Sequence, residues 1–302
     1  MPALRIAIRL SLLLAGTSAI GATTKLQDIA PSTPWELRYA DDSCYLARTF
    51  GQGDGQLQLR LSRFYPGPNL DVIVAGLEVA AGETQFPPQF YFEGQGLPKA
   101  IPAPDAYFGV LGNLPMVDFG TRRLDNVRLD QVPQVESHIQ PEPTPEQEAA
   151  VDRAFVRMPN GHLLRLRLGS MKEPMAALRG CIQDAIRNWG FDPTEQANLK
   201  RRAWPDSWAA MTTLVQADYP FSMFTSDGVT TVHVRLDIDE AGKVSGCHVQ
   251  VPILPNDIPL TTCRQLMAYG KFQPAINAED KPTKSWFAAT VRYRRPMRRL
   301  GS

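Results

Sequence analysis

Strict alternation of apolar and polar residues is the sequence feature that most limits what this chain can fold into. Residues 56–64 (QLQLRLSRF) and residues 231–238 (TVHVRLDI) place every second side chain on an apolar face. A period of two is typical of a half-buried β-strand and does not fit a helix. Both halves of the chain are therefore expected to contain sheets with one apolar face.

The 302 residues are 43% hydrophobic and 21% charged, which is typical of a folded protein, and the length suits about two domains. The first domain, residues 27–192, is predicted to be β-rich, because Asp-Gly, Pro-Gly and Asn-Gly turns separate its short strands. A closing helix is predicted where apolar residues from Met175 to Trp189 recur every three or four positions. Residues 140–148 (QPEPTPEQE) are expected to form a surface loop. The predicted fold class is α+β.

The first 22 residues are typical of a secretory signal peptide. Arg5 and Arg9 supply the positive charge, residues 10–16 (LSLLLAG) a short apolar stretch, and residues 19–22 (AIGA) the small side chains for cleavage. An uncleaved anchor needs about 20 apolar residues, and polar residues interrupt this stretch. We therefore expect a protein of the periplasm and cell envelope, with no transmembrane helix in the mature chain.

Charge points to no polyanionic partner. Loss of Arg5 and Arg9 with the signal peptide brings the 32 basic residues to 30, against 31 acidic residues. A balanced charge gives no general attraction to nucleic acid or to anionic membranes. Nucleic acid is therefore not expected as a partner.

Export makes the four cysteines candidates for disulfide bonds. An even number of cysteines in an oxidising compartment favours pairing, and no CxxC spacing occurs that would indicate redox or zinc chemistry. Four cysteines allow three pairings. We favour Cys44–Cys181 with Cys247–Cys263, because each pair then stays within one predicted domain.

Residues 213–298 are predicted to form a second, smaller domain after a linker at residues 193–212. Two alternating strands lie on either side of an Asp-Glu-Ala-Gly turn, a helical stripe from Leu260 to Met267 follows, and residues 286–293 alternate again. The order β-β-α-β implies a small antiparallel sheet with the helix packed on one face.

These segments resemble the C-terminal domain of the TonB family over residues 218–295. The motifs are residues 218–220 (DYP) ahead of the first strand, residues 232–249 (VHVRLDIDEAGKVSGCHV), residues 272–275 (FQPA) and a terminal strand. The resemblance implies a periplasmic, non-catalytic domain that binds a peptide strand of an outer-membrane TonB-dependent receptor or of another envelope protein. In that family the terminal strand is an edge that accepts its partner by β-augmentation, so the implied function is protein binding linked to transmembrane transport.

The resemblance places the partner along the edge from Trp286 to Arg294. The implied contact residues lie on one face of this strand and in the segment before it: Phe272, Gln273, Pro274, Trp286, Ala288, Thr290 and Arg292. Trp286 faces away from the predicted core, so it contacts either the partner or the first domain, and the sequence leaves both open. The same edge would also serve a homodimer of a self-associating structural envelope protein.

Other chemistry has weaker support in the sequence. His233, His248 and Asp237 lie on adjacent predicted strands, but a solvated polar face is the commoner arrangement, so no metal site and no cofactor are predicted. No G-x-S-x-G motif occurs, so no catalytic residues are predicted. An envelope enzyme or metal-binding protein with its site in residues 27–192 is the alternative.

Overall fold

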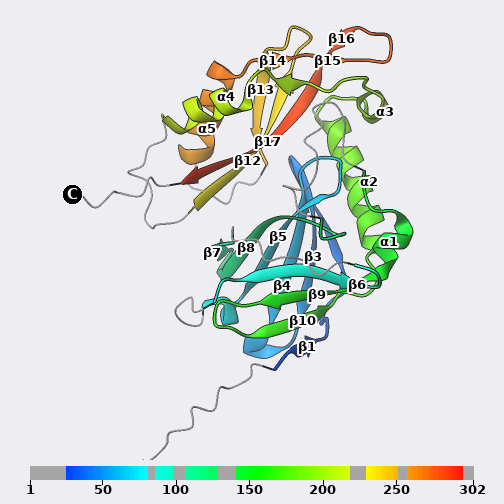
Figure 1. The fold of residues 1–302 in the computed structure, drawn as a ribbon, viewed down its shortest axis with the longest axis vertical. Helices are drawn as coiled ribbons and strands as arrows, with labels where there is room; N and C mark the ends of the chain where they lie inside the picture. The colour runs from blue at the N-terminus through cyan, green and yellow to red at the C-terminus, as the bar shows by residue number, and fades with distance from the viewer. Residues whose placement is uncertain are drawn as a thin grey trace, which may run out of the picture.

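The computed structural model describes residues 25–80, 86–97, 106–127, 141–217, 229–250 and 257–294. The predicted signal peptide and the family-like residues 218–220 lie outside these ranges. The described chain has a mixed α+β fold, which confirms the predicted class at that level. Two sheets and a long helix form the N-terminal part, and a third sheet with two helices forms the C-terminal part (Figure 1).

The N-terminal part contains two β-sheets. One is antiparallel with the order β2-β3-β4-β5-β8-β7, and the other has the order β1-β10-β9-β6, in which β1 pairs in parallel with β10. The strands of the first sheet are β2 (Glu36–Ala40), β3 (Ser43–Phe50), β4 (Leu57–Arg63), β5 (Asn69–Gly76), β7 (Tyr107–Leu111) and β8 (Leu114–Arg123). The strands of the second sheet are β1 (Gln27–Ile29), β6 (Gln89–Gly94), β9 (Val151–Arg157) and β10 (Leu163–Arg167).

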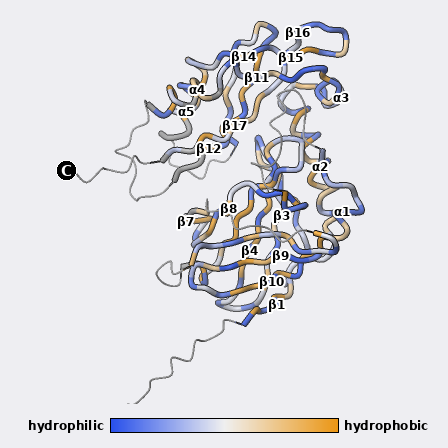
Figure 2. The backbone as a smooth tube through the Cα atoms, viewed as in Figure 1, coloured by the Kyte–Doolittle hydropathy of each residue, from blue (hydrophilic) through white to orange (hydrophobic). Residues whose placement is uncertain are grey.

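The two sheets share one hydrophobic core with helix α2 (Lys172–Asn188), which is the predicted closing helix. Leu59 and Leu61 of β4 are fully buried in this core, together with Leu178 of α2. Figure 2 shows hydrophobic and hydrophilic residues following one another along β4, β9 and β10. The period of two is therefore the pattern that sends one face of each sheet inward.

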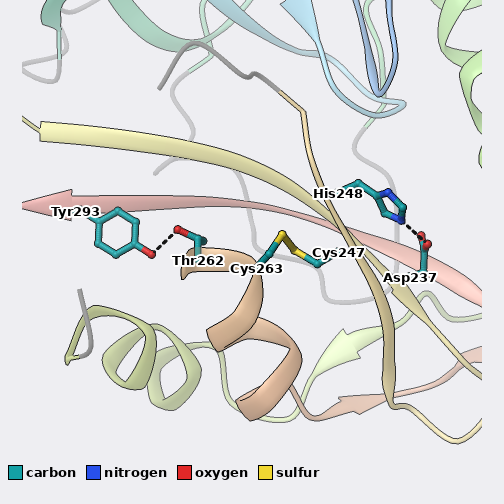
Figure 3. Close-up of a disulfide and its surroundings, with 6 residues drawn as sticks. All are labelled: Asp237, Cys247, His248, Thr262, Cys263 and Tyr293. Atoms are coloured by element: carbon teal, nitrogen blue, oxygen red, sulfur yellow. Dashed lines mark hydrogen bonds and ion pairs between the residues drawn. A yellow bond between two sulfur atoms is a disulfide. The ribbon is translucent and has the colours of Figure 1, made fainter. Parts of the chain in front are cut away.

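Two disulfide bonds form with the pairing that the sequence favoured. Cys44 of β3 is bonded to Cys181 of α2, which ties the helix to the six-stranded sheet. Cys247 of β13 (Val244–Val249) is bonded to Cys263 of α5 (Asp257–Tyr269), as Figure 3 shows. Disulfides persist in oxidising compartments, so this pairing fits an extracytoplasmic protein.

The C-terminal sheet is antiparallel and has the order β13-β12-β17. Strands β12 (Val229–Ile238) and β17 (Ser285–Arg294) pair over their whole length. Helix α5 lies on one face, where Leu266 shares a core with Leu236, and where the hydroxyls of Thr262 and Tyr293 are hydrogen-bonded at 2.8 Å (Figure 3). The three strands of this sheet and α5 follow one another along the chain as β12, β13, α5 and β17, with shorter strands between α5 and β17.

Residues 193–212, the predicted linker, pack on the C-terminal part. They contain α3 (Pro193–Ala197), the short strand β11 (Trp204–Pro205) and the start of α4 (Trp208–Ala217). Ala203 and Met211 are buried in the same core as α5. Strand β11 pairs with β14 (Phe272–Gln273), and a further small hairpin joins β15 (Ala275–Ile276) to β16 (Pro282–Thr283).

Replacing both cysteines of one disulfide by serine should destabilise the protein more for Cys44–Cys181 than for Cys247–Cys263. The sequence separations are 137 and 16, and the chain-entropy model assigns such loops about 5 and about 3 kcal/mol. Thermal unfolding of the two double-serine variants under non-reducing conditions measures the order. Equal or reversed losses of Tm would show that loop entropy does not govern these bonds.

Candidate functional site

Strand β17 lies at the end of the C-terminal sheet, and among the described strands only β12 pairs with it. The Gln250 N–H donates to the His233 carbonyl at 2.9 Å, so His233 directs its backbone polar groups toward β13. Along an antiparallel strand, the backbone N–H and C=O of successive residues point alternately to one neighbouring strand and to the other. The backbone groups of Val232 and Val234, on either side of His233, therefore point toward Val291 and Ala289 of β17. The intervening residues of β17 therefore direct N–H and C=O outward: Trp286, Ala288, Thr290 and Arg292.

The side chains of Trp286 and Ala288 face the N-terminal part. Trp286 is 4% exposed, and its ring centroid lies 5.9 Å from that of Trp189, which follows α2, and 6.4 Å from that of Tyr65. Ala288 packs against the same core. Of the two placements that the sequence left open for Trp286, the structure shows the contact with the N-terminal part. We therefore no longer assign the buried Trp286 ring to a partner.

Residues 272–274 are largely occupied by the chain itself. Both residues of β14 pair with the linker strand β11. Phe272 is 5% exposed with its ring centroid 5.2 Å from that of Phe287, so it is a core residue and not the contact that the resemblance implied. The Pro274 carbonyl accepts a hydrogen bond from Arg201 at 3.2 Å, whereas the Gln273 side chain stays exposed.

The linker passes around the start of β17. The guanidinium carbon of Arg202 lies 4.4 Å from the Trp286 ring centroid, on the face toward the N-terminal part. The Trp204 ring lies 5.8 Å from the Phe287 ring, in the core on the opposite face. Successive side chains of a strand point to opposite faces, so the linker must cross from one face to the other beside these two residues.

Helix α3 covers the start of β17 further. The Gln196 side chain donates to the Lys284 carbonyl at 3.1 Å and accepts from the Ser285 hydroxyl at 2.7 Å. Gln196 and Ser285 are both buried, so this contact is a fixed part of the fold. Within the described residues, the open length of the edge therefore runs from Ala288 to Arg294.

A polar junction holds the C-terminal sheet on the N-terminal part. Arg235 is 3% exposed and pairs with Asp42, in the turn between β2 and β3, at 2.9 Å. It also pairs with Asp237 of its own strand, whose carboxylate lies 2.8 Å from His248 Nε2 (Figure 3). The guanidinium carbon lies 4.5 Å from the Trp189 ring centroid. One buried cation thus compensates carboxylates from both parts of the chain.

Gln250 makes a second connection across the same junction. Its side-chain amide donates to the carbonyls of Asp42 at 2.9 Å and Phe64 at 2.8 Å. Its own carbonyl accepts from the Ser43 hydroxyl at 3.2 Å. Gln250 and Ser43 are buried, where losing a hydrogen-bond partner costs about 1–3 kcal/mol. These bonds hold the end of β13 against the start of β3 and against Phe64, which follows β4.

His233 corrects the expectation of a solvated polar face. It is 7% exposed, and its ring stacks on that of Phe64 at 4.3 Å. Its Nδ1 lies 3.1 Å from Thr290 Oγ1, and its Nε2 lies 3.9 Å from an Asp71 carboxylate oxygen. His233 and His248 thus have different polar partners. The described residues contain no group of three or more His, Cys, Asp and Glu side chains placed to hold a metal ion.

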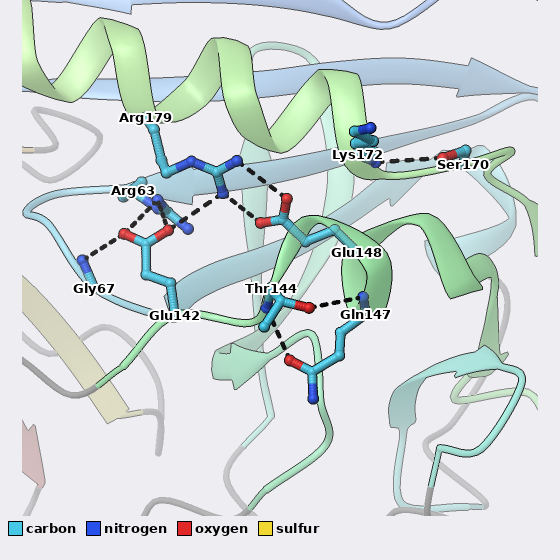
Figure 4. A network of polar contacts seen from close by, with 9 residues as sticks. All are labelled: Arg63, Gly67, Glu142, Thr144, Gln147, Glu148, Ser170, Lys172 and Arg179. Atoms are coloured by element: carbon cyan, nitrogen blue, oxygen red, sulfur yellow. Dashed lines mark hydrogen bonds and ion pairs between the residues drawn. The ribbon is translucent and has the colours of Figure 1, made fainter.

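The described part of residues 140–148 is not the expected surface loop. Helix α1 (Pro145–Ala150) begins after Thr144, whose hydroxyl accepts from the Gln147 N–H while the Gln147 side chain accepts from the Thr144 N–H (Figure 4). Glu148 is fully buried. In the sequence, Glu148 looks like one more charged residue of a solvated loop, because its ion-pair partner lies on a helix 31 residues further along the chain.

That partner belongs to a partly buried ion-pair cluster in the N-terminal part (Figure 4). Arg179 of α2 pairs with Glu148 and, at 3.4 Å, with Glu142. Glu142 also pairs with Arg63 of β4 at 3.1 Å, and burial lowers the pKa of Arg63. Two cations and two anions compensate one another, so the cluster fastens α1 to α2 and β4. It does not favour the alternative of an enzyme site in this part.

Comparisons with known proteins give no match. No family model matches the sequence, no curated protein matches it, and no solved structure matches the fold. The resemblance to the TonB C-terminal domain therefore stays a prediction that rests on the residues quoted for it. None of the helices in the described residues is long and apolar enough to cross a membrane.

Arg235→Met should weaken the junction, because the carboxylates of Asp42 and Asp237 would lose their shared cation. Removing one partner of a buried ion pair costs about 3–5 kcal/mol, whereas an exposed pair contributes about 0–1 kcal/mol. Arg187→Met is the matched control, since Arg187 and Asp184 form a pair with side chains 58% and 54% exposed. Urea unfolding should show a loss of more than about 2 kcal/mol for the first variant only. Small, similar losses in both would contradict the junction.

Proposed function

We propose that this protein is an exported, non-catalytic binding protein of the periplasm whose C-terminal part binds a peptide strand by β-augmentation. The observation that supports the proposal is the open edge of β17. Ala288, Thr290 and Arg292 direct N–H and C=O outward there, and no described strand pairs with that side. An open edge is a ready template for one further strand.

The proposal keeps the layout expected from the sequence. Residues 1–22 are the signal peptide, residues 27–192 a β-rich domain, residues 193–212 a linker and residues 213–298 a TonB-like domain. Both disulfides suit this destination, because such bonds form and persist in oxidising compartments. The partner is a strand of an outer-membrane TonB-dependent receptor or of another envelope protein, as the TonB resemblance implies.

Recognition at this edge relies mainly on backbone groups. Ala288, Thr290 and Arg292 offer three donors and three acceptors at the open edge, and each hydrogen bond contributes about 1 kcal/mol net. Ordering the peptide costs about 1–2 kcal/mol for every residue that is fixed. Backbone pairing alone therefore does not hold a flexible peptide. The partner must be extended before it binds, or further groups must bind it.

Self-association would use the same edge. Two copies can pair their β17 edges about a two-fold axis, because an antiparallel pair of identical strands is self-complementary. Such pairing would give a homodimer in place of a complex with another protein. Sedimentation of the purified protein over a range of concentrations separates the two functions, and we expect a monomer.

Ala288→Pro should abolish binding while leaving the fold intact. The proline removes an outward N–H and places its ring at the edge, whereas the ladder with β12 does not use the Ala288 N–H. Wild-type and variant proteins, each fixed to a resin, would be exposed to an envelope extract. The captured partner should fall at least about tenfold with the variant, because several hydrogen bonds of about 1 kcal/mol each are lost.

Ala289→Pro is the matched control one residue along the strand. Its N–H faces β12, so proline there should break the ladder and lower the free energy of unfolding by about 1–3 kcal/mol. Equal capture by wild-type protein and folded Ala288→Pro would reject β-augmentation at this edge. A wild-type dimer that Ala288→Pro dissociates would favour self-association instead.

A further inference from the structure

Three buried hydrogen-bond donors beside the start of β17 have no acceptor among the described residues. They are Nη2 of Arg202 and the Nε1 atoms of Trp189 and Trp286. The two indole rings lie 5.9 Å apart, and the guanidinium carbon of Arg202 lies 4.4 Å from the Trp286 ring centroid. Buried polar groups in folded proteins almost always have a hydrogen-bond partner. A ligand that supplies acceptors would satisfy these three donors.

Arg202 also has no counter-ion in the part of the chain that the structure describes. The buried residues Arg63 and Arg235 each contact a carboxylate. Burial lowers the pKa of Arg202 to about 10, and no charged side chain in the described ranges offsets this effect. A desolvated cation without a partner is costly, and a bound anion would remove that cost. The ligand that best fits these donors is therefore an anion.

Arg202 lies where the open edge of β17 ends. It belongs to the linker that passes around Trp286, and α3 covers the backbone before that residue through its contacts with Lys284 and Ser285. A strand added along the open edge cannot continue past this point without displacing the linker. The end of the added strand therefore lies next to Arg202.

We propose that the bound peptide stops at this point and that Arg202 and the two indole N–H groups bind its C-terminal carboxylate. The inference rests on the proposed function and adds the chemistry of the partner, which is an extended C-terminal segment. A chain end beside the start of β17 makes the added strand antiparallel to β17. Charge-assisted hydrogen bonds to the carboxylate supply affinity that backbone pairing lacks.

Two arrays of random ten-residue peptides test this inference, one with free C-terminal carboxylates and one with C-terminal amides. The wild-type protein should select peptides from the first array, and amidation of the selected peptides should weaken binding about tenfold or more. The Arg202→Gln variant should bind the peptides with free carboxylates about tenfold more weakly than the wild type does, and should bind the amidated peptides as the wild type does. Lys200→Gln is the matched control in the same linker, because Lys200 is exposed and pairs with Asp280.

Arg202→Gln removes a buried charge that no described carboxylate compensates, so the Tm of the variant should stay unchanged or rise. A loss of binding then does not reflect unfolding.

Ala288→Pro separates the two proposals. If no peptide binds in an Ala288-dependent manner, the proposed function fails. If binding depends on Ala288 but neither amidation nor Arg202→Gln changes it, peptide recognition stands and the carboxylate site is rejected. Arg202-dependent binding of amidated peptides with internal Asp or Glu would also overturn the proposal.

Discussion

Burial of both faces of the β13-β12-β17 sheet is the constraint on which the remaining structure depends. The face that carries Leu236 and Val291 belongs to a core shared with α4 and α5. The face that carries His233 and Trp286 lies against the N-terminal part. With both faces covered, side chains of this sheet have little left to offer another molecule. The backbone at the outer edge of β17 is what remains, and this is why the proposed recognition is by strand addition.

The junction makes that edge rigid before any partner arrives. Arg235 and Gln250 join the sheet to Asp42 and to the segment after β4, and the Cys247–Cys263 bond holds α5 on the opposite face. A binding edge that is already ordered loses less conformational entropy on association. The ordering cost then falls mainly on the peptide, and a strong contact at the end of the peptide, such as the one proposed at Arg202, offsets part of it.

Local patterns in the sequence predicted the strands and the closing helix, because alternation and helical spacing act within short segments. The disulfide pairing was predicted from export and from keeping each pair within one predicted domain. Alternation shows that one face of β12 is polar, but it does not show whether that face meets water or another polar surface. His233 was therefore expected to be solvated and is in fact buried. Glu148 was misplaced for the same reason, since its partner Arg179 lies far along the chain. A two-residue strand such as β14 is too short to show an alternating hydrophobic pattern, so the sequence did not predict that Phe272 is buried. The edge position of β17 was implied only by the resemblance to the TonB family, and no sequence pattern indicated that residues 193–212 close its start.

Amide hydrogen exchange in the purified protein can show whether the edge of β17 is open, because it reports each backbone N–H of this strand separately. We expect rapid exchange at Ala288, Thr290 and Arg292, whose N–H groups point outward, and slow exchange at Ala289 and Val291, whose N–H groups pair with β12. Slow exchange at all five would mean that the edge is already paired in the free protein, and would contradict an edge that is open to a partner strand.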